Sequence, residues 1–154
     1  MDYFLQYHRE PITLSSGLKS HWFVDGRLIF EDVRLREAVL EHWLARLSKE
    51  PYWHLSPVLE GGKSWMEALG DRLEGVSWGQ QPENAGTRPI AIIEDVMTTG
   101  RSAAKVAVDM VTVHSPWPLI LCVVERREQK WPFEVVSWAR LNLSFCDGGK
   151  CCSS

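Results

Sequence analysis

Hydrophobic and polar positions alternate with different periods along the chain, and the changes predict a succession of strands and helices. An apolar run from Ile90 leads into two acidic residues and a short turn. Apolar residues spaced as on one face of a helix follow at once. These helical positions are Ala103, Val106, Ala107, Met110 and Val111. The pattern predicts a strand, a turn and a helix in that order.

Two earlier segments have the pattern of helices with a polar start. Asp32 is the expected N-cap of a helix that reaches about residue 48, and Pro51 ends it. A second helix follows the turn at Gly61-Gly62, with Gly75 as its expected C′ residue. The apolar stripes are Leu35, Val39, Leu40, Trp43, Leu44 and Leu47 in the first helix, and Trp65, Met66, Leu69 and Leu73 in the second.

Further short runs are typical of strands. They are His54–Leu59, Val76–Trp78, Leu119–Val124 and a region between Val135 and Phe145. Strands that alternate with helices favour an α/β fold with a doubly wound, mostly parallel sheet. With 154 residues and 45% hydrophobic content, residues 1–154 are expected to form a single domain.

Composition excludes several classes of function. The net charge is −3 and no basic stripe offsets it, so no nucleic-acid partner is expected. No apolar run approaches the length of a membrane span, and the N-terminus lacks a signal-peptide pattern, so no membrane partner is expected. The four cysteines are not the disulfide framework of a small secreted domain, which favours a cytoplasmic protein. Residues 147–154 resemble a frayed end, with a metal site as the alternative.

The acidic pair Glu94 and Asp95 and the turn Thr98-Thr99-Gly100 carry the clearest chemistry. Open α/β sheets bind ligands at the carboxyl ends of their strands, where the pair is expected. The turn offers hydroxyls and N–H groups at a helix start, which suits an anion. Carboxylates accept hydrogen bonds from sugar hydroxyls, so the combination suits a phosphorylated ribose. The alternative is an acidic strand end followed by an ordinary capped helix.

Residues 90–102 resemble the phosphoribosyl-diphosphate (PRPP) signature of type I phosphoribosyltransferases, and more narrowly that of orotate phosphoribosyltransferase. The resemblance implies that fold, with a small N-terminal hood of residues 1 to about 30. It implies that the acidic pair binds the ribose hydroxyls, that Asp95 is catalytic, and that the turn wraps the 5′-phosphate. The PRPP-binding set is Glu94, Asp95, Val96, Met97, Thr98, Thr99, Gly100, Arg101 and Ser102, with Arg101 where the family usually has a second glycine.

The segment before the second helix resembles the pyrophosphate loop of the same family. Gly61, Gly62 and Lys63 are the expected pyrophosphate-binding residues, because glycines let the backbone approach an anion closely. Glu60 replaces the family's threonine and should repel pyrophosphate, a charge that Lys63 would offset. The alternative is a plain turn between a strand and a helix.

Two segments resemble the parts of the orotate enzymes that contact the base. In the N-terminal one, Trp22 and Phe23 would form a flat wall with Lys19 nearby, while Ser15 stands where the family has a ligand-binding lysine. In the other, Arg126 matches the arginine that contacts the orotate ring. The alternatives are that the two aromatic residues belong to the core and that Arg126 is a solvated charge.

One feature of the orotate enzymes is missing. Their lysine-rich mobile loop would fall in residues 75–89, where Arg88 is the only cation and histidine is absent. Two functions therefore stay open. The first is an enzyme of pyrimidine biosynthesis that transfers ribose 5-phosphate from PRPP to a base such as orotate and releases pyrophosphate. The second is a non-catalytic regulatory protein that binds PRPP or a nucleotide.

The resemblance also implies partners. The expected small-molecule partners are PRPP and a base, with Mg²⁺ held mainly by PRPP and no metal site built by the protein alone. A homodimer is expected, because dimers are usual in the family and the chain has eight tryptophans, a residue type enriched at interfaces. Trp22, Trp53, Trp117 and Trp131 are in predicted loops.

Overall fold

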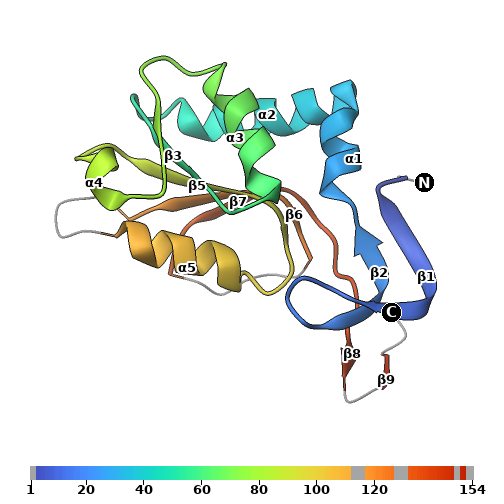
Figure 1. The fold of residues 1–154 in the computed structure, drawn as a ribbon. Helices are drawn as coiled ribbons and strands as arrows, with labels where there is room; N and C mark the ends of the chain where they lie inside the picture. The colour runs from blue at the N-terminus through green and yellow to red at the C-terminus, as the bar shows by residue number, and fades with distance from the viewer. Residues whose placement is uncertain (1–2, 112–116, 127–131, 148–149, 152–154) are drawn as a thin grey trace.

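The computed structural model describes residues 3–111, 117–126, 132–147 and 150–151. A parallel sheet lies between two layers of helices, and a smaller antiparallel sheet stands beside it (Figure 1). Trp131, Cys152 and part of the predicted tail lie outside the described residues. In the described part of the chain, no helix has the length and apolar character needed to cross a membrane.

The main sheet confirms the predicted α/β class. Within the described residues it has five parallel strands in the order β4-β3-β5-β6-β7. They are β3 (His54–Pro57), β4 (Ser77–Trp78), β5 (Ile90–Met97), β6 (Leu119–Glu125) and β7 (Val135–Arg140). The central strand β5 pairs with β3 through Ile93 and Pro57 and with β6 through Ile93 and Leu121. The apolar run from Ile90 is therefore a buried central strand, as predicted.

Helices cover both faces of this sheet (Figure 1). On one face lie α1 (Gly26–Glu31), α2 (Val33–Leu47) and α3 (Gly61–Gly70), and on the other lies α5 (Arg101–Met110). The short α4 (Pro82–Ala85) precedes β5. Residues of β5 alternate between two apolar clusters: Ala91 and Ile93 pack in the cluster with α2 and α3, and Ile90 and Ile92 in the cluster with α5. A strand buried on both faces reads as a continuous apolar run for this reason.

The start of α2 and its core contacts follow the sequence pattern. The Asp32 carboxylate accepts hydrogen bonds from the N–H groups of Arg34 (3.0 Å) and Leu35 (3.2 Å), which confirms the predicted N-cap. Trp43 is fully buried and packs edge-on against Trp65 of α3, with ring centroids 5.5 Å apart. Its indole N–H donates to the carbonyl of Cys122 in β6 at 3.3 Å, so this side chain joins two helices to the sheet.

The predicted second helix ends earlier than expected. It stops at Gly70 rather than continuing through Leu73, so Gly75 is not its C′ residue. Gly75 lies in the following turn at a φ of 62°, and a Cβ there would lie 2.6 Å from the Tyr52 ring. The glycine is needed at this turn for its left-handed backbone and for the close approach of the ring, not for ending the helix.

The second sheet forms the hood. It consists of β1 (Leu5–Thr13), β2 (Lys19–Val24), β8 (Cys146–Asp147) and β9 (Lys150–Cys151), in the order β1-β2-β8-β9. The predicted N-terminal hood of residues 1 to about 30 is corrected in two ways. Helix α1 packs on α2 and α3 instead of joining the hood. Cys146 pairs with Lys19 at the free edge of β2, because a strand edge offers unpaired backbone groups, and the predicted frayed tail contributes Lys150 and Cys151 to the strand that pairs with β8.

The cysteine prediction also needs a correction. Cys146 is disulfide-bonded, whereas the sequence indicated a chain without a disulfide framework. Cys122, by contrast, is a free and buried thiol in β6. Among the described residues, no group of three or more histidine, cysteine or acidic side chains has the arrangement of a metal site.

We expect the two-helix contact at Trp43 to dominate the stability of the main body. Trp43→Ala should lower the free energy of unfolding by roughly 3–5 kcal/mol, because it leaves a cavity and removes the hydrogen bond to β6. Trp78→Ala is the matched control, since the Trp78 side chain is 63% exposed, and it should change stability by no more than about 0.5 kcal/mol. Urea unfolding followed by circular dichroism measures both, and equal losses would contradict the assignment.

Candidate functional site

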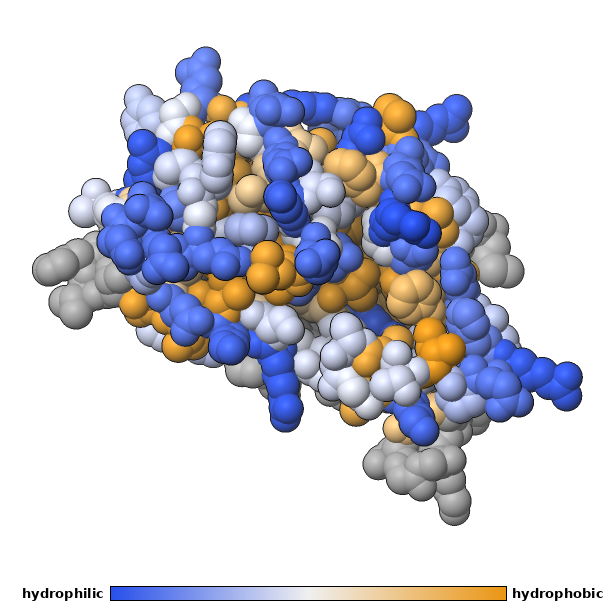
Figure 2. Space-filling model, viewed as in Figure 1, coloured by the Kyte–Doolittle hydropathy of each residue, from blue (hydrophilic) through white to orange (hydrophobic). Residues whose placement is uncertain are grey.

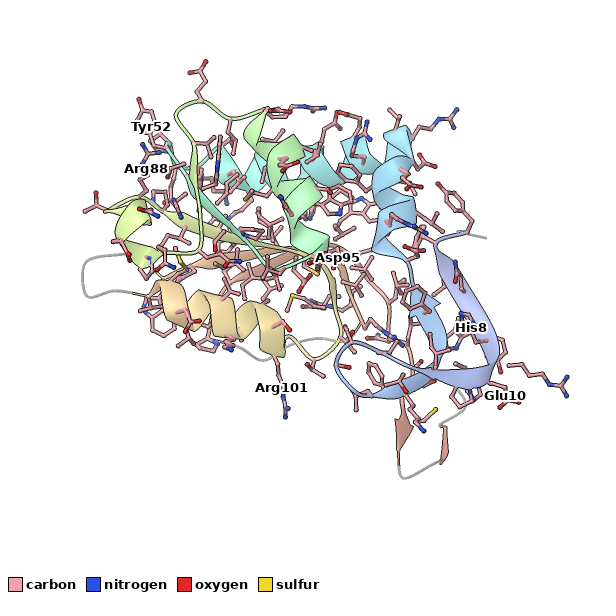
Figure 3. All side chains as sticks on the ribbon, in the orientation of Figure 1. His8, Glu10, Tyr52, Arg88, Asp95 and Arg101 are labelled. Atoms are coloured by element: carbon pink, nitrogen blue, oxygen red, sulfur yellow. The ribbon has the colours of Figure 1, made fainter. Side chains whose placement is uncertain are left out.

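Three hollows meet at Asp95, on the carboxyl half of β5. The turn cavity, about 530 Å³, is lined by residues 94–103 and by the segment before α3. The hood cavity, about 260 Å³, lies under β2, and the helix cavity, about 380 Å³, lies between α1 and α3. Asp95 lines all three. Figure 2 shows the surface hollowed on this face, and Figure 3 shows Asp95 beside the start of α3.

The path of β5 and the turn after it place the predicted residues together. The strand continues beyond the acidic pair, with Val96 opposite Val124 and Met97 opposite Glu125. All nine residues predicted to bind PRPP, from Glu94 to Ser102, line the turn cavity. The acidic pair is therefore near the strand's carboxyl end, as predicted, although it does not end the strand itself.

The turn before α5 has the backbone that a phosphate site needs. Gly100 has a φ of 78°, a left-handed conformation that glycine adopts without strain. The Thr99 hydroxyl accepts a hydrogen bond from the N–H of Arg101 at 3.3 Å. The first N–H groups of a helix have no partner within the helix, and its dipole favours an anion there. Arg101 is exposed, and Figure 3 shows its side chain extending away from Asp95.

Burial changes the charge of the acidic pair. Desolvation raises the pKa of Glu94 to about 10, and its hydrogen bond and charge interaction with Asp95 add to the shift. The Asp95 N–H donates to Glu94 Oε1 at 2.9 Å, and the Val96 N–H donates to Asp95 Oδ1 at 2.7 Å. At neutral pH Glu94 is therefore a neutral acid, able to donate as well as accept a hydrogen bond from a sugar.

Of the four residues predicted to contact a base, the structure brings two to the hood cavity. Phe23 and Arg126 line it. Trp22 does not, because successive side chains of a strand point to opposite faces, and its ring packs on Tyr7 with centroids 5.0 Å apart. Lys19 is exposed at the far end of β2, away from the cavity lining. Of the two aromatic residues predicted to form a wall for the base, only Phe23 therefore lines the hood cavity.

Arg126 is a buried cation that also ties the hood to the main sheet. Its Nη1 donates to the carbonyl of Trp22 at 3.2 Å, its Nη2 donates to the Ser20 hydroxyl at 3.0 Å, and its guanidinium lies 4.6 Å from the Phe145 ring centroid. Only 1% of the residue is exposed, so the alternative of a solvated charge is wrong. Burial lowers the pKa of Arg126 to about 10, which leaves it protonated at neutral pH.

The buried positive charge of Arg126 would favour binding of an anionic or carbonyl-rich ligand. Within the described residues no carboxylate forms an ion pair with it, and its Nε has no hydrogen-bond partner. A buried charge without a counter-ion is costly unless something compensates it. A ligand with a carboxylate or ring carbonyls in the hood cavity would supply that compensation.

The helix cavity depends on two glycines that contact the Asp95 carboxylate. A Cβ on Gly26 would lie 2.8 Å from Asp95 Oδ2, and a Cβ on Gly61 would overlap the same carboxylate. Both α1 and α3 can begin this close to β5 only because these residues lack a side chain. Glu60 lines both the turn cavity and the helix cavity.

Of the three residues predicted to bind pyrophosphate, the structure places Gly61 alone in the cavity linings. Gly61 lines the turn and helix cavities. Gly62 is buried, and a Cβ there would overlap the carbonyl of Ile93, so this glycine serves the packing of α3 on β5. Lys63 is exposed and lies outside the lining of all three cavities. The predicted cation opposite Glu60 is therefore not at the site.

Residues that the sequence did not assign also line the site. Ser15 and Ser16 lie in the turn between β1 and β2 and reach the turn cavity, and Gly26 and Arg27 line the helix cavity. The available signal was Arg27, which directly follows the N-terminal segment 14–26 that resembles the orotate enzymes. That signal is weak, because the six-residue helix α1 is too short to give a clear periodic pattern.

One known protein resembles the chain in sequence. The chain is 33% identical over 102 residues to orotate phosphoribosyltransferase of Pyrobaculum aerophilum, an alignment that covers 58% of this chain and 53% of that protein. The chain thus spans about half the length of this relative. No family model matches the chain.

Solved structures agree over most of the chain. Orotate phosphoribosyltransferase from Aeropyrum pernix superposes with a TM-score of 0.72 at 24% identity, covering 90% of this chain and 89% of that one. Adenine phosphoribosyltransferase from Thermoanaerobacter pseudethanolicus superposes with a TM-score of 0.60 at 14% identity, covering 86% and 95%. The chain has the type I phosphoribosyltransferase fold. Within that class, the predicted resemblance to the orotate enzymes is confirmed.

The raised pKa of Glu94 predicts a specific pH dependence of stability. Between the ordinary value of 4.5 and about 10, the unfolded chain loses the Glu94 proton and the folded chain keeps it. The stability of the wild type should therefore fall relative to Glu94→Gln as the pH rises from 5 to 8, by up to about 4 kcal/mol. Urea unfolding at the two pH values measures this difference.

The control for this experiment is Glu67→Gln, which removes an exposed carboxylate from α3. Its stability difference from the wild type should change little between the two pH values. If Glu94→Gln behaves like this control, Glu94 is ionised in the folded protein and the charge assigned to the acidic pair is wrong.

Proposed function

We propose that the chain is a phosphoribosyltransferase that joins ribose 5-phosphate from PRPP to a pyrimidine base, orotate in particular, and releases pyrophosphate. The observation that carries the proposal is the meeting of three cavities at Asp95. PRPP bears a phosphate at C5 of the ribose and a diphosphate at C1, and the base attacks C1. A site for this reaction therefore needs three cavities around one ribose, for the 5-phosphate, the diphosphate and the base.

Each branch has side chains suited to one part of the reactants. The turn cavity would hold the 5′-phosphate at the start of α5 and the ribose hydroxyls at Glu94 and Asp95. The hood cavity would hold the base against Phe23 and Arg126. The helix cavity would hold the diphosphate close to Gly61, where a side chain would block its approach.

The reaction follows from this placement. The bond between C1 and the diphosphate oxygen breaks with its electrons leaving on the diphosphate, and a ring nitrogen of the base forms the new bond to C1. Positive charge develops on the ribose as the bond breaks, and the Asp95 carboxylate beside the sugar would stabilise it. Glu94, as a neutral acid, would bind a hydroxyl without adding a second negative charge.

The choice of orotate is supported by chemistry and by similarity. Orotate has a carboxylate and two ring carbonyls, and Arg126 is a buried cation without a carboxylate partner among the described residues. The sequence match is to an orotate phosphoribosyltransferase, although an adenine phosphoribosyltransferase shares the fold. A panel of bases is therefore part of the test.

Mg²⁺ fits the site as a cation carried by the substrate. The Asp95 and Glu60 carboxylates line the helix cavity and offer oxygen ligands of the kind that Mg²⁺ prefers. When bound with PRPP, the ion would neutralise part of the diphosphate charge. PRPP is highly charged and does not cross membranes unaided, so a cytoplasmic setting is part of the proposal.

A second function remains open, in which the same cavities bind PRPP or a nucleotide without turnover. The absence of a cationic loop in residues 75–89 favours it, and so does the carboxylate of Glu60 beside the diphosphate branch. Arg88, the one cation of that interval, donates to the carbonyl of Gly75 and lies well away from Asp95 in Figure 3. Binding and turnover therefore have to be measured separately.

Calorimetry with PRPP and Mg²⁺, followed by a product assay with orotate, uracil, adenine and hypoxanthine, tests the proposal. Asp95→Asn and Thr99→Val should each weaken PRPP binding by roughly 1–3 kcal/mol without unfolding the protein, since each loses hydrogen bonds to a charged or polar ligand. Thr87→Val, at an exposed position outside the three cavities, is a control for loss of a threonine hydroxyl. Binding that is unchanged in both site variants would contradict the site, and binding without product would favour the second function.

We propose a homodimer as well, as in the orotate enzymes that the chain resembles. An exposed aromatic residue such as Trp117, which is 63% exposed, is the kind of side chain that interfaces bury. Light scattering at micromolar concentration should report twice the mass of the 17.6 kDa chain. A single species of monomer mass would contradict the proposed homodimer.

A further inference from the structure

We propose that Arg27 binds the departing diphosphate and supplies the positive charge that the missing loop would otherwise provide. This role rests on the proposed function, and no role for Arg27 was predicted from the sequence. The charge of the helix cavity supports it. Glu60 and Asp95 contribute carboxylates to its lining, and a pyrophosphate bound there would be repelled by both. Among the described lining residues, Arg27 is the only cation.

The backbone of Arg27 is fixed at the cavity while its side chain is free to move. The Asp25 carboxylate caps α1 by accepting from the Arg27 N–H at 3.1 Å. Gly26, the residue between them, packs against the Asp95 carboxylate, which sets the distance of α1 from β5. The Arg27 side chain is 74% exposed, and its ion pair with Asp25 is long, at 3.8 Å. A ligand in the cavity would therefore compete with a weak contact.

Arg27 also lies where the bond to the diphosphate would break. It lines both the hood cavity and the helix cavity, and these two share Gly26 and Asp95. The base and the diphosphate occupy opposite sides of the ribose C1 in the proposed reaction, so a residue at this boundary is next to the reacting bond. A guanidinium presents several N–H donors in a planar fork, which suits two oxygens of a diphosphate.

The other candidate cations have different placements. Arg88 donates to the carbonyl of Gly75, away from the site, and Lys63 is exposed outside the cavity lining. Arg101 lines the turn cavity from the start of α5 and extends away from Asp95 (Figure 3). Arg126 is buried in the hood cavity with its Nη atoms already donating to the hood. Within the described residues, Arg27 is the cation placed for the diphosphate.

Binding of inorganic pyrophosphate and of ribose 5-phosphate to the full chain, measured by calorimetry in magnesium-free buffer, separates the branches of the site. Arg27→Gln should weaken pyrophosphate binding by about 10-fold or more, since a hydrogen-bonded charge is lost. Its affinity for ribose 5-phosphate should stay within about 2-fold of the wild type, because that ligand occupies the turn cavity. Arg27→Lys should retain part of the pyrophosphate affinity, since it keeps the charge but not the fork.

Two further variants sharpen the result. Arg9→Gln removes an exposed cation from β1, outside the three cavities, and should leave both affinities unchanged. Glu60→Gln should act in the opposite direction to Arg27→Gln and tighten pyrophosphate binding, because it removes a repelling carboxylate. If product forms, Arg27→Gln should lower kcat more than it raises the KM for the base.

The outcomes distinguish this inference from the function on which it rests. If the wild type and Arg27→Gln bind pyrophosphate equally, and both bind ribose 5-phosphate, the role of Arg27 is overturned and the proposed function stands. A wild type that binds neither ligand overturns both. Equal loss of pyrophosphate binding in Arg9→Gln would show a general charge effect and would also overturn the specific role.

Discussion

The close contact of two helix starts with one carboxylate is the constraint on which the site depends. Gly26 at the start of α1 and Gly61 at the start of α3 both touch Asp95, and a methyl group on either would displace it. This contact sets how far each helix stands from β5, and the remaining space forms the three cavities. The large buried contacts of α2 and α3, centred on Trp43 and Trp65, hold the helices in place behind it.

The charged residues around Asp95 give each of the three cavities a different electrostatic character. Burial raises the pKa of Glu94 and keeps it neutral, so a sugar bound here would meet one carboxylate charge from the pair. Arg126 is a cation under the hood with no carboxylate partner among the described residues, and it fixes the hood by its hydrogen bonds to β2. Arg27 lines both the hood cavity and the helix cavity, where we propose that it contacts the diphosphate. In the proposed function, Arg126 and Arg27 would together supply the positive charge around the reacting sugar.

The sequence predicted the centre of the site well, because the relevant signals are local. A strand, an acid pair and a glycine turn at a helix start are contiguous, so all nine residues from Glu94 to Ser102 line one cavity. Long-range packing decided what was missed. Side chains alternate between the two faces of β2, so Trp22 packs on Tyr7 and points away from the cavity. Gly62 packs on β5. Cys146 pairs with Lys19 of the hood, although the two residues are far apart in the sequence. None of these follows from a local pattern.

A crystal structure of the protein soaked with ribose 5-phosphate tests the central claim most directly, since it shows where the sugar lies relative to Asp95. The predicted result has the 5′-phosphate within hydrogen-bond distance of the Thr98-Thr99-Gly100 turn and the ribose hydroxyls on Glu94 and Asp95. The ribose C1 should then face both the hood cavity and the helix cavity. A phosphate bound elsewhere, or a sugar whose C1 points away from Asp95, would contradict the convergence of three reactant parts on this carboxylate.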